Sequence, residues 1–322
     1  MNLKKSALVG IDVSYKTFNA YFSGTDCLYK NTRIGWQKLL REAPPGSVYA
    51  MEATGNYHFR LASYLHGRGM AVIVLNPYYV KHWIISQGGK AKTDRINARD
   101  IYFYVLGNGS SVRHWQPLPP LYARARVIVT LLSSLSNLSK SANNINHSIS
   151  LVVGKTNGML NPMLNVYSVC REQEKALEME LVEIVKKIFP NQYNLLLTIP
   201  GLGSKSASVF LATTRGFSEF ASYRQLTSYI GLAPSVEESG TSVRRKSRIT
   251  KTGNNYLRSL LFMCAMTALS KANPCKELYV RLVKRGKPKK LAIIAVMHRL
   301  VKISFGVVQS GEPYRGNNLL LA

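Results

Sequence analysis

Acidic side chains are scarce in this chain. Its 322 residues include 16 Asp and Glu against 43 Lys and Arg, which gives a formal net charge of +27. An excess of this size argues against a cationic partner and favours a polyanion, above all a nucleic acid. Charge alone leaves one alternative open, a ribosome-associated or nonspecifically adhesive basic protein.

Cysteine is scarce as well, and several common motifs are missing. The four cysteines, Cys27, Cys170, Cys264 and Cys275, form no C-x-x-C pair and have no histidine at ligand spacing. Their spacing argues against a zinc site and against a disulfide framework. The chain has no G-x-x-x-x-G-K-[ST] phosphate loop. Its apolar runs look too short to cross a membrane, so we expect no membrane partner and a place inside the cell.

Basic residues are concentrated in two late stretches. "SVRRKSRITKTGNNYLR" (242–258) carries six of them and no acid, and "RLVKRGKPKKL" (281–291) carries six more. Each phosphate that they neutralise releases counterions, so binding should weaken steeply with salt. The nucleic-acid contacts expected here are Arg244, Arg245, Lys246, Arg248, Lys251, Arg258, Lys287, Lys289 and Lys290.

The first third of the chain alternates predicted strands and helices. Strands are expected at 7–14, 18–24, 46–52 and 70–77, and a helix at 59–69. This alternation indicates an α/β domain with some parallel strand pairing. A further helix is expected at 93–106 with Thr93 as its N-cap, and the Pro-rich "WQPLPP" (115–120) marks a domain boundary.

A long helix follows that boundary and carries a heptad pattern. The apolar spacing of 3 and 4 residues is typical of a coiled-coil seam, here Ile128, Leu131, Leu135, Leu138, Ala142, Ile145, Ile149 and Val152. A second, Glu-rich helix repeats Leu177, Leu181, Ile184 and Ile188. The two helices can pair with each other as a hairpin or with a second copy of the chain, and the pattern leaves both open.

From residue 191 onward the chain is predicted to be mostly helical. "TIPGLGSKSASVFLATT" (198–214) contains a P-G-x-G turn that opens a helix. Backbone N–H groups at such a turn bind phosphate well, and helix-hairpin-helix DNA-binding elements use it, as do some purely structural turns. We therefore count Gly201, Gly203 and Lys205 as candidate nucleic-acid contacts.

Three acids come from separated elements of the first domain. Asp12 lies on the first strand, Glu52 ends a later strand, and Asp94 lies near the start of the 93–106 helix. Two-metal nucleases use such a set, because carboxylates hold the Mg²⁺ ions that stabilise the attacking and leaving oxygens. Asn97, one predicted helical turn after Asp94, stands where another acid would complete the set, and Asp100 lies one turn further on.

Ser239 is a second candidate for chemistry. It lies in "VEESGTSVRR" (236–245), where its hydroxyl could meet a phosphate held by Arg244 or Arg245. No histidine or lysine stands at a recognisable triad spacing to activate it. A polar loop with exposed serines is the alternative for this stretch.

Several blocks of the sequence resemble one family of enzymes. The blocks include "GIDVS" (10–14), "MEATGNY" (51–57), "KTDRINARD" (92–100), "TIPGLGSKSASVFLA" (198–212), "YIGLAPSVEESGTSVR" (229–244) and "ITKTGNNYLRSLLFMCAM" (249–266). In this order they resemble the transposases of the insertion-sequence 110/1111 class, which includes the Piv and MooV recombinases.

That resemblance implies a fold and a division into domains. It implies an α/β RNase H-like (RuvC-like) domain at 1–116 and a helical coiled-coil region for dimerisation at 117–190. A mainly α C-terminal transposase domain at 191–322 would carry the serine and the helix-hairpin-helix-like turn.

The resemblance also implies a reaction and its partners. A non-coding bridge RNA would direct recombination between donor and target double-stranded DNA, with Mg²⁺ as cofactor and homodimers assembled into a tetramer. The metal-binding acids fall on Asp12, Glu52 and Asp94, and the nucleophile that forms a phosphoserine link falls on Ser239. Lys92 and Arg95, beside the third acid, are expected to contact nucleic acid.

The family's fourth acid falls on Asn97, where this sequence departs from the pattern. Three explanations remain: a natural asparagine ligand, replacement by Asp100, or an Asp-to-Asn change that traps a complex. Other functions also remain open: a site-specific invertase of the same family, a metal-dependent nuclease without a covalent intermediate, and a catalytically impaired nucleic-acid-binding protein. A sugar-kinase-like ATPase also opens with "GID", but Val13 stands where those folds place a glycine.

Overall fold

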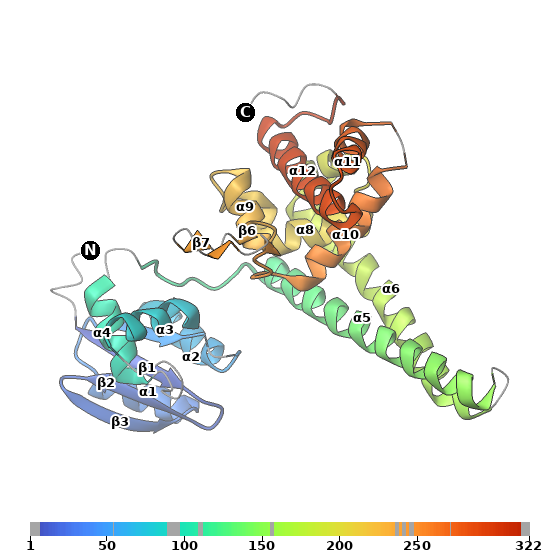
Figure 1. The fold of residues 1–322 in the computed structure, drawn as a ribbon. Coiled ribbons are helices and arrows are strands. Elements are labelled where there is room, and N and C mark those ends of the chain that lie inside the picture. The colour runs from blue at the N-terminus through green and yellow to red at the C-terminus, as the bar shows by residue number, and fades with distance from the viewer. Residues whose placement is uncertain are drawn as a thin grey trace. The chain divides into compact units, whose positions relative to one another are not determined.

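The computed structural model describes residues 7–53, 55–88, 97–108, 112–154, 158–235, 238–239, 243–244, 248–270 and 272–316. The chain divides into two units, Met1–Leu118 and Pro119–Ala322 (Figure 1). The division falls within the expected Pro-rich boundary. It gives two units and not three, because the long helices after that boundary share one hydrophobic core with the later helices.

The N-terminal unit is built on a five-stranded sheet with the strand order β3-β2-β1-β4-β5. Its strands are β1 (Leu8–Val13), β2 (Thr17–Phe22), β3 (Thr25–Lys30), β4 (Val48–Glu52) and β5 (Ala71–Leu75). The first three pair antiparallel, whereas β1, β4 and β5 run parallel. The predicted alternation of strands and helices and the parallel pairing are therefore confirmed.

Helices cover both faces of this sheet. They are α1 (Arg33–Glu42), α2 (His58–His66), α3 (Pro77–Ser86) and α4 (Ala98–Asn108). Side chains alternate along a strand, and the two core clusters follow this alternation. Val9 and Ile11 belong to the core with α1 and α2, whereas Leu8 and Ala50 belong to the core with α3 and α4. The unit is thus a three-layer α/β/α arrangement.

Gly10 allows α4 to lie directly on β1. A Cβ atom at this position would lie 2.2 Å from the carbonyl oxygen of Ala98 and 2.7 Å from the backbone nitrogen of Tyr102. Only a glycine permits this approach. The first turn of α4 therefore lies over the middle of β1, on the face of the sheet to which Leu8 and Gly10 belong.

The C-terminal unit is mainly helical (Figure 1). Its helices are α5 (Pro120–Val153), η2 (Gly158–Leu160), α6 (Asn161–Ile188), α7 (Pro190–Leu197), α8 (Ser204–Thr214), η3 (Arg215–Phe217), α9 (Tyr223–Ile230), α10 (Asn255–Ala268), α11 (Pro274–Lys284) and α12 (Lys289–Ser310). Four two-residue strands lie between α9 and α10: β6 (Pro234–Ser235), β7 (Glu238–Ser239), β8 (Val243–Arg244) and β9 (Arg248–Ile249).

The helices α5 and α6 form a long hairpin within one chain (Figure 1). The buried α5 side chains are Tyr122, Ala125, Ile128, Val129, Leu132, Ser139 and Ala142. This set only partly matches the expected heptad seam. Another part of that seam, repeated every seven residues, remains on the outside: Leu131, Leu138, Ile145 and Val152. The hairpin alternative is observed, and pairing with a second copy stays a prediction for the outer residues.

The helix α12 corrects one expectation from the sequence. It is long and apolar enough to cross a membrane, with a mean hydropathy of 1.9 over 18 residues. Within that window 44% of the residues are buried in the protein, and α12 packs against α7, α9, α10 and α11. Its apolar character is explained by its place as the central helix of the C-terminal core.

Candidate active site

Asp12 and Glu52 lie next to each other near the carboxyl ends of two neighbouring strands, β1 and β4. The parallel register of β1 and β4 pairs Gly10 with Ala50 and Ile11 with Met51, so Asp12 and Glu52 occupy the next matching positions. Neighbouring strands lie about 4.8 Å apart, and matching positions point to the same face. Both carboxylates therefore leave the sheet on the face that α3 and α4 cover, and both are half-buried.

The start of α4 gives Asn97 a defined structural role. The Asn97 side-chain oxygen accepts a hydrogen bond from the backbone N–H of Asp100 at 2.9 Å, and the Asp100 carboxylate accepts one from the backbone N–H of Asn97 at 3.2 Å. This reciprocal pair is a capping box. The expected helix over 93–106 is wrong at position 97, because Asn97 is not helical and α4 begins at Ala98. Thr93, the expected N-cap, lies outside the described residues.

This correction changes the argument about a fourth metal ligand. Asn97 precedes α4 and is not part of a helix, so an argument from a shared helix face no longer applies to it, and both Asn97 and Asp100 are engaged in the cap of α4. Asp94 itself, with Lys92 and Arg95, lies outside the described residues. Among the residues that the structure describes, no three His, Cys, Asp or Glu side chains gather at one place.

Ser239 lies on a small β-hairpin of the C-terminal unit. In β7 and β8, Ser239 pairs with Val243 and Glu238 pairs with Arg244. The pair β6 and β9 continues the hairpin toward the helices, with Ser235 opposite Arg248. The backbone thus brings Ser239, Arg244 and Arg248 onto one hairpin. Arg245 and Lys246 lie outside the described residues.

The base of this hairpin is built by close backbone contacts. A Cβ atom on Gly253 would lie 2.3 Å from the Tyr229 carbonyl oxygen, and one on Gly231 would lie 2.9 Å from the Thr252 nitrogen. The Arg258 guanidinium donates a hydrogen bond of 2.9 Å to the Ile230 carbonyl at the end of α9. Burial lowers the pKa of Arg258. Arg258, expected to touch nucleic acid, therefore holds the end of α9 in this structure.

The P-G-x-G turn joins α7 to α8. Gly201 has a positive φ of 91°, and a Cβ there would lie 2.4 Å from the Cys264 carbonyl of α10. The Gly203 N–H donates to the hydroxyl of Ser206 at 2.9 Å. The packing contact explains Gly201, whereas a Cβ at Gly203 would meet no atom within 4 Å. Binding of a phosphate at this turn stays a prediction.

Lys205 has a partner that the sequence did not reveal. Its ammonium donates to the carboxylate of Glu178 on α6 and lies 6.0 Å from the ring centroid of Tyr256. Burial alone would lower the pKa of Lys205, but the Glu178 hydrogen bond and the neighbouring charges raise it. Lys205 therefore ties the α5–α6 hairpin to α8, whereas its predicted contact with nucleic acid is not tested.

The remaining basic candidates lie on the surface. Lys251 follows β9, Lys287 lies between α11 and α12, and Lys289 and Lys290 begin α12. All four side chains are exposed. Contact of these four lysines with a nucleic acid stays a prediction.

Sequence reasoning missed the structural partners of several candidates. The capping box could have been recognised, because Asn97-Ala98-Arg99-Asp100 has the N-x-x-D form of a helix start. The Glu178 partner of Lys205 and the Ile230 partner of Arg258 are 27 and 28 residues away. No local pattern identifies contacts of that kind.

Models of known families match both units of the chain. A model of DEDD-type IS110 transposases matches residues 9–151, and the model described as "Transposase IS116/IS110/IS902 family" matches residues 193–281. The first match includes Asp12, Glu52 and the start of α4, and the second includes the Ser239 hairpin.

Curated relatives extend over nearly the full chain. The chain is 27% identical over 317 residues to the pilin gene-inverting protein of Moraxella bovis, which covers 95% of this chain and 97% of the relative. It is 21% identical over 353 residues to a probable family 20 transposase of Pseudomonas aeruginosa, which covers 98% and 99%. The chain therefore belongs to the IS110 family of transposases.

Proposed function

We propose that the protein is an RNA-guided DNA recombinase that cuts and rejoins strands through Mg²⁺-binding acids and a serine nucleophile. The observation that carries this proposal is the register of two parallel strands, which brings Asp12 and Glu52 to matching positions directly after the last registered pair. The strand order, an antiparallel β3-β2-β1 meander continued by parallel β4 and β5, supports an RNase H-like assignment. The family itself establishes a DNA-processing enzyme.

The residues present fit a divalent metal ion. Two carboxylates about one strand spacing apart offer the hard oxygen ligands that Mg²⁺ prefers. The N-terminal end of α4 lies on the same face, and Asn97 there follows Asp94 by three residues. Asp12, Glu52 and Asp94 would hold the metal, with Asn97 or Asp100 as the fourth position. The metal, when bound, would stabilise negative charge on the reacting oxygens of the phosphodiester.

The serine step follows from the chemistry of a phosphodiester. The Ser239 oxygen forms a bond to phosphorus while the bond from phosphorus to one deoxyribose oxygen breaks. The serine loses its proton and the leaving oxygen gains one, so the number of phosphoester bonds is unchanged. Attack by the deoxyribose oxygen of another strand reverses the step and releases Ser239. Strands can therefore be exchanged without ATP.

The positive charge of the chain supports binding to the phosphate backbone of nucleic acids, a contact that does not depend on the base sequence. With +27 net charge, and exposed lysines at 251, 287, 289 and 290, the protein can bind the backbone of donor and target DNA and of a bridge RNA. Base pairing between the RNA and the DNA would then select the sequence.

The outer stripe of α5 supports assembly into homodimers and then a tetramer. Leu131, Leu138, Ile145 and Val152 repeat every seven residues and are 45%, 55%, 45% and 84% exposed. A heptad stripe that one chain leaves uncovered is suited to pairing with the same stripe of a second chain.

The test of this function is capture of the covalent intermediate. The protein is incubated with Mg²⁺, its element's RNA and a suicide DNA substrate, and a protein–DNA adduct is sought on a denaturing gel. Ser239→Ala should abolish the adduct. Ser235→Ala, four residues earlier on the same hairpin, should leave it unchanged. An adduct that survives Ser239→Ala would refute the serine role, and cleavage without any adduct would indicate a nuclease that uses water.

A second candidate, site-specific inversion, is favoured by one comparison. Two relatives that align over nearly the whole chain are pilin gene-inverting proteins, from Moraxella bovis and Moraxella lacunata. The two reactions use the same strand exchange and differ in the arrangement of the DNA sites. A plasmid with two sites in inverted orientation would report inversion, and capture of an element at new targets would report transposition.

A further inference from the structure

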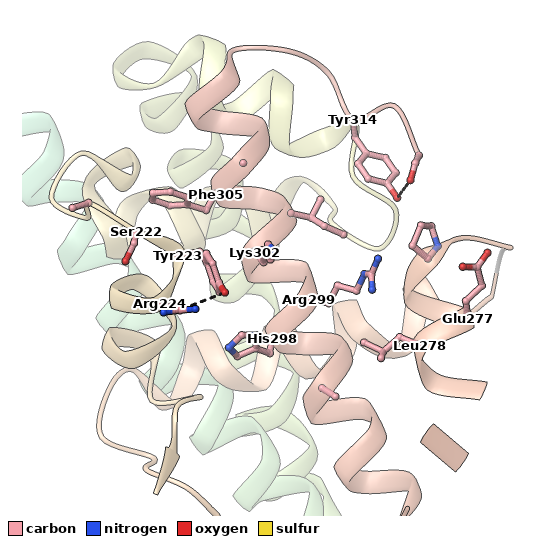
Figure 2. A pocket seen from close by; sticks show the side chains of 16 residues that line it. Ser222, Tyr223, Arg224, Glu277, Leu278, His298, Arg299, Lys302, Phe305 and Tyr314 are labelled. Atoms are coloured by element: carbon pink, nitrogen blue, oxygen red, sulfur yellow. Dashed lines mark hydrogen bonds between the residues drawn. The ribbon is translucent and has the colours of Figure 1, made fainter. Parts of the chain in front are cut away.

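A second candidate binding site lies in the C-terminal unit, apart from the Ser239 hairpin. A cavity of about 950 Å³ extends over α12 between α9 and α11 (Figure 2). Tyr223 and Arg224 line it from the start of α9, and the α12 side chains that line it include His298, Arg299 and Lys302. Figure 2 shows Arg299 pointing toward α11, while His298 lies on the α9 side.

The cavity holds positive charge that carboxylates do not neutralise. Arg224, Arg299 and Lys302 form no ion pair within 4.0 Å among the described residues, and the described lining contains one acid, Glu277. Arg299 and Lys302 are half-buried. Burial and then the charge of Lys302 lower the pKa of His298. Partial burial of Arg299 and Lys302 costs free energy of hydration, which a bound anion would offset.

Aromatic rings stand among these cations. The Lys302 ammonium lies 5.2 Å from the ring centroid of Tyr223, and the Arg224 guanidinium lies 5.9 Å from it. The His298 ring meets Tyr223 edge to face at 6.0 Å. Phe305 and Tyr314 line the same cavity. The site thus combines fixed cations, suited to phosphate, with flat π surfaces, suited to a base.

The size of the cavity narrows the ligand class. About 950 Å³ is far more than inorganic phosphate needs and falls in the range of sites for sizeable organic ligands. In an intact duplex the bases are stacked within the double helix, so they cannot contact the aromatic side chains of the cavity. Unpaired nucleotides can, and proteins recognise them by stacking on aromatic side chains and by cationic contact to the backbone.

We propose that this cavity binds an unpaired nucleotide of a single-stranded nucleic acid segment. Arg224, Arg299 and Lys302 hold its phosphates, and Tyr223 with the neighbouring rings contacts its base. The inference rests on the proposed function only in taking a nucleic acid as partner. It adds a site for single-stranded nucleic acid to the exposed lysines that are proposed to bind the DNA backbone.

The test measures binding to the full-length protein by fluorescence anisotropy. The probes are a labelled uridine decamer RNA, a labelled thymidine decamer DNA and a labelled duplex DNA. Arg299→Gln combined with Lys302→Gln should weaken binding of at least one single strand by about tenfold and of the duplex by less than about twofold. The arm that weakens more identifies RNA or DNA as the source. The control, Lys140→Gln combined with Lys187→Gln, removes two exposed lysines outside the cavity and should affect all probes equally.

A crosslinking experiment on the unmodified protein guards against a misfolded variant. A decamer containing 4-thiouridine is photocrosslinked and the modified peptides are identified by mass spectrometry. Crosslinks at 221–224 or 298–306 support the site. Crosslinks confined to other regions, or equal losses in the cavity and control variants, overturn it.

These readouts do not depend on recombination. If the cavity variants bind single strands normally while the wild-type protein forms the Ser239 adduct, the cavity proposal fails and the proposed function stands. If no adduct forms while the cavity variants lose single-strand binding, the reverse holds.

Discussion

The two units of the chain position their candidate catalytic residues in different ways. In the N-terminal unit, Asp12 and Glu52 are fixed by the hydrogen-bonded register of two central strands and by the close contact of Gly10 with α4. In the C-terminal unit, Ser239 lies on a hairpin of two-residue strands whose base is held by Gly231, Gly253 and Arg258. The first pair is held along the hydrogen-bonded strands that carry it, whereas the described contacts of the second arrangement lie at the base of its hairpin.

The difference suits the chemistry proposed for each unit. Metal-binding carboxylates must keep their separation, because the geometry of Mg²⁺ coordination is strict. A serine that attacks one phosphate and later leaves it must reach DNA and be released again. Substitutions that separate rigidity from chemistry therefore test the comparison directly.

The largest effect is expected from the paired carboxylates. Asp12→Asn or Glu52→Gln should reduce adduct formation by at least about a thousandfold, because each removes a charged metal ligand. Thermal unfolding of each variant checks that a loss of adduct is not a loss of folding. Asp26→Asn, on the exposed strand β3, is the matched control and should retain activity. An adduct that forms normally in a folded Asp12→Asn variant would contradict a metal-binding role.

The next effect concerns the rigid unit itself. Gly10→Ala should destabilise the N-terminal unit by about 3 kcal/mol, because its Cβ would overlap the backbone of α4. Gly107→Ala is the control in the same helix. No atom lies within 4 Å of a Cβ at that position, so this change should stabilise the helix by about 0.5–1 kcal/mol. Thermal unfolding measures both, and equal effects would refute the tight contact of α4 with β1.

The hairpin base separates a structural cation from a binding cation. Arg258→Gln should lower the stability of the C-terminal unit by about 2 kcal/mol, because it removes a charged hydrogen bond to Ile230. The salt dependence of DNA binding by the Arg258→Gln variant should equal that of the wild-type protein. Lys251→Gln, exposed beside the hairpin, should keep the stability and reduce the slope of log K against log salt by about 1. If Arg258→Gln changed the salt slope and Lys251→Gln lowered the stability, Arg258 would be the binding cation and Lys251 the structural one.

The smallest effect is expected at the start of α4. Asn97→Ala should cost about 1 kcal/mol of stability, because the N-cap is lost. Asn97→Asp should keep the cap and lower the Mg²⁺ concentration needed for half-maximal adduct formation, since a carboxylate binds this cation better than an amide does. An unchanged Mg²⁺ dependence would leave Asn97 with the capping role alone.

The sequence predicted β1, β2, β4 and β5 of the N-terminal sheet because their signals are local, but it did not predict β3, α1 or α3. Apolar runs bounded by turns identified the central strands, and the placement of Asp12 and Glu52 at strand ends followed from them. The contact between Gly10 and Ala98 spans 88 residues of chain, so no pattern in the sequence reveals it. The start of α4 was placed too early because a helical hydrophobic pattern outweighed the capping signal of Asn97 and Asp100.

The helical unit shows a different limit. The buried side chains of α5 match the expected heptad seam only in part, because the spacing of apolar residues does not tell which stripe the partner helix covers. The inner stripe, with Val129 and Leu132, faces the core, and Leu131 and Leu138 stay outside. Lys205, Arg258 and Lys251 likewise look equivalent in the sequence. Their partners, fixed only by tertiary contacts, separate two structural cations from an exposed one.

The register of β1 and β4 has a consequence for insertions and deletions. The segment between these strands, which contains β2, β3 and α1, can change length at its surface turns without moving Glu52 relative to Asp12. A deletion of a single residue inside β4 would instead turn Glu52 to the opposite face of the sheet, toward α1 and α2. The distance between the two carboxylates therefore does not depend on the length of the connecting segment, but it is lost when β4 shifts its register by one residue.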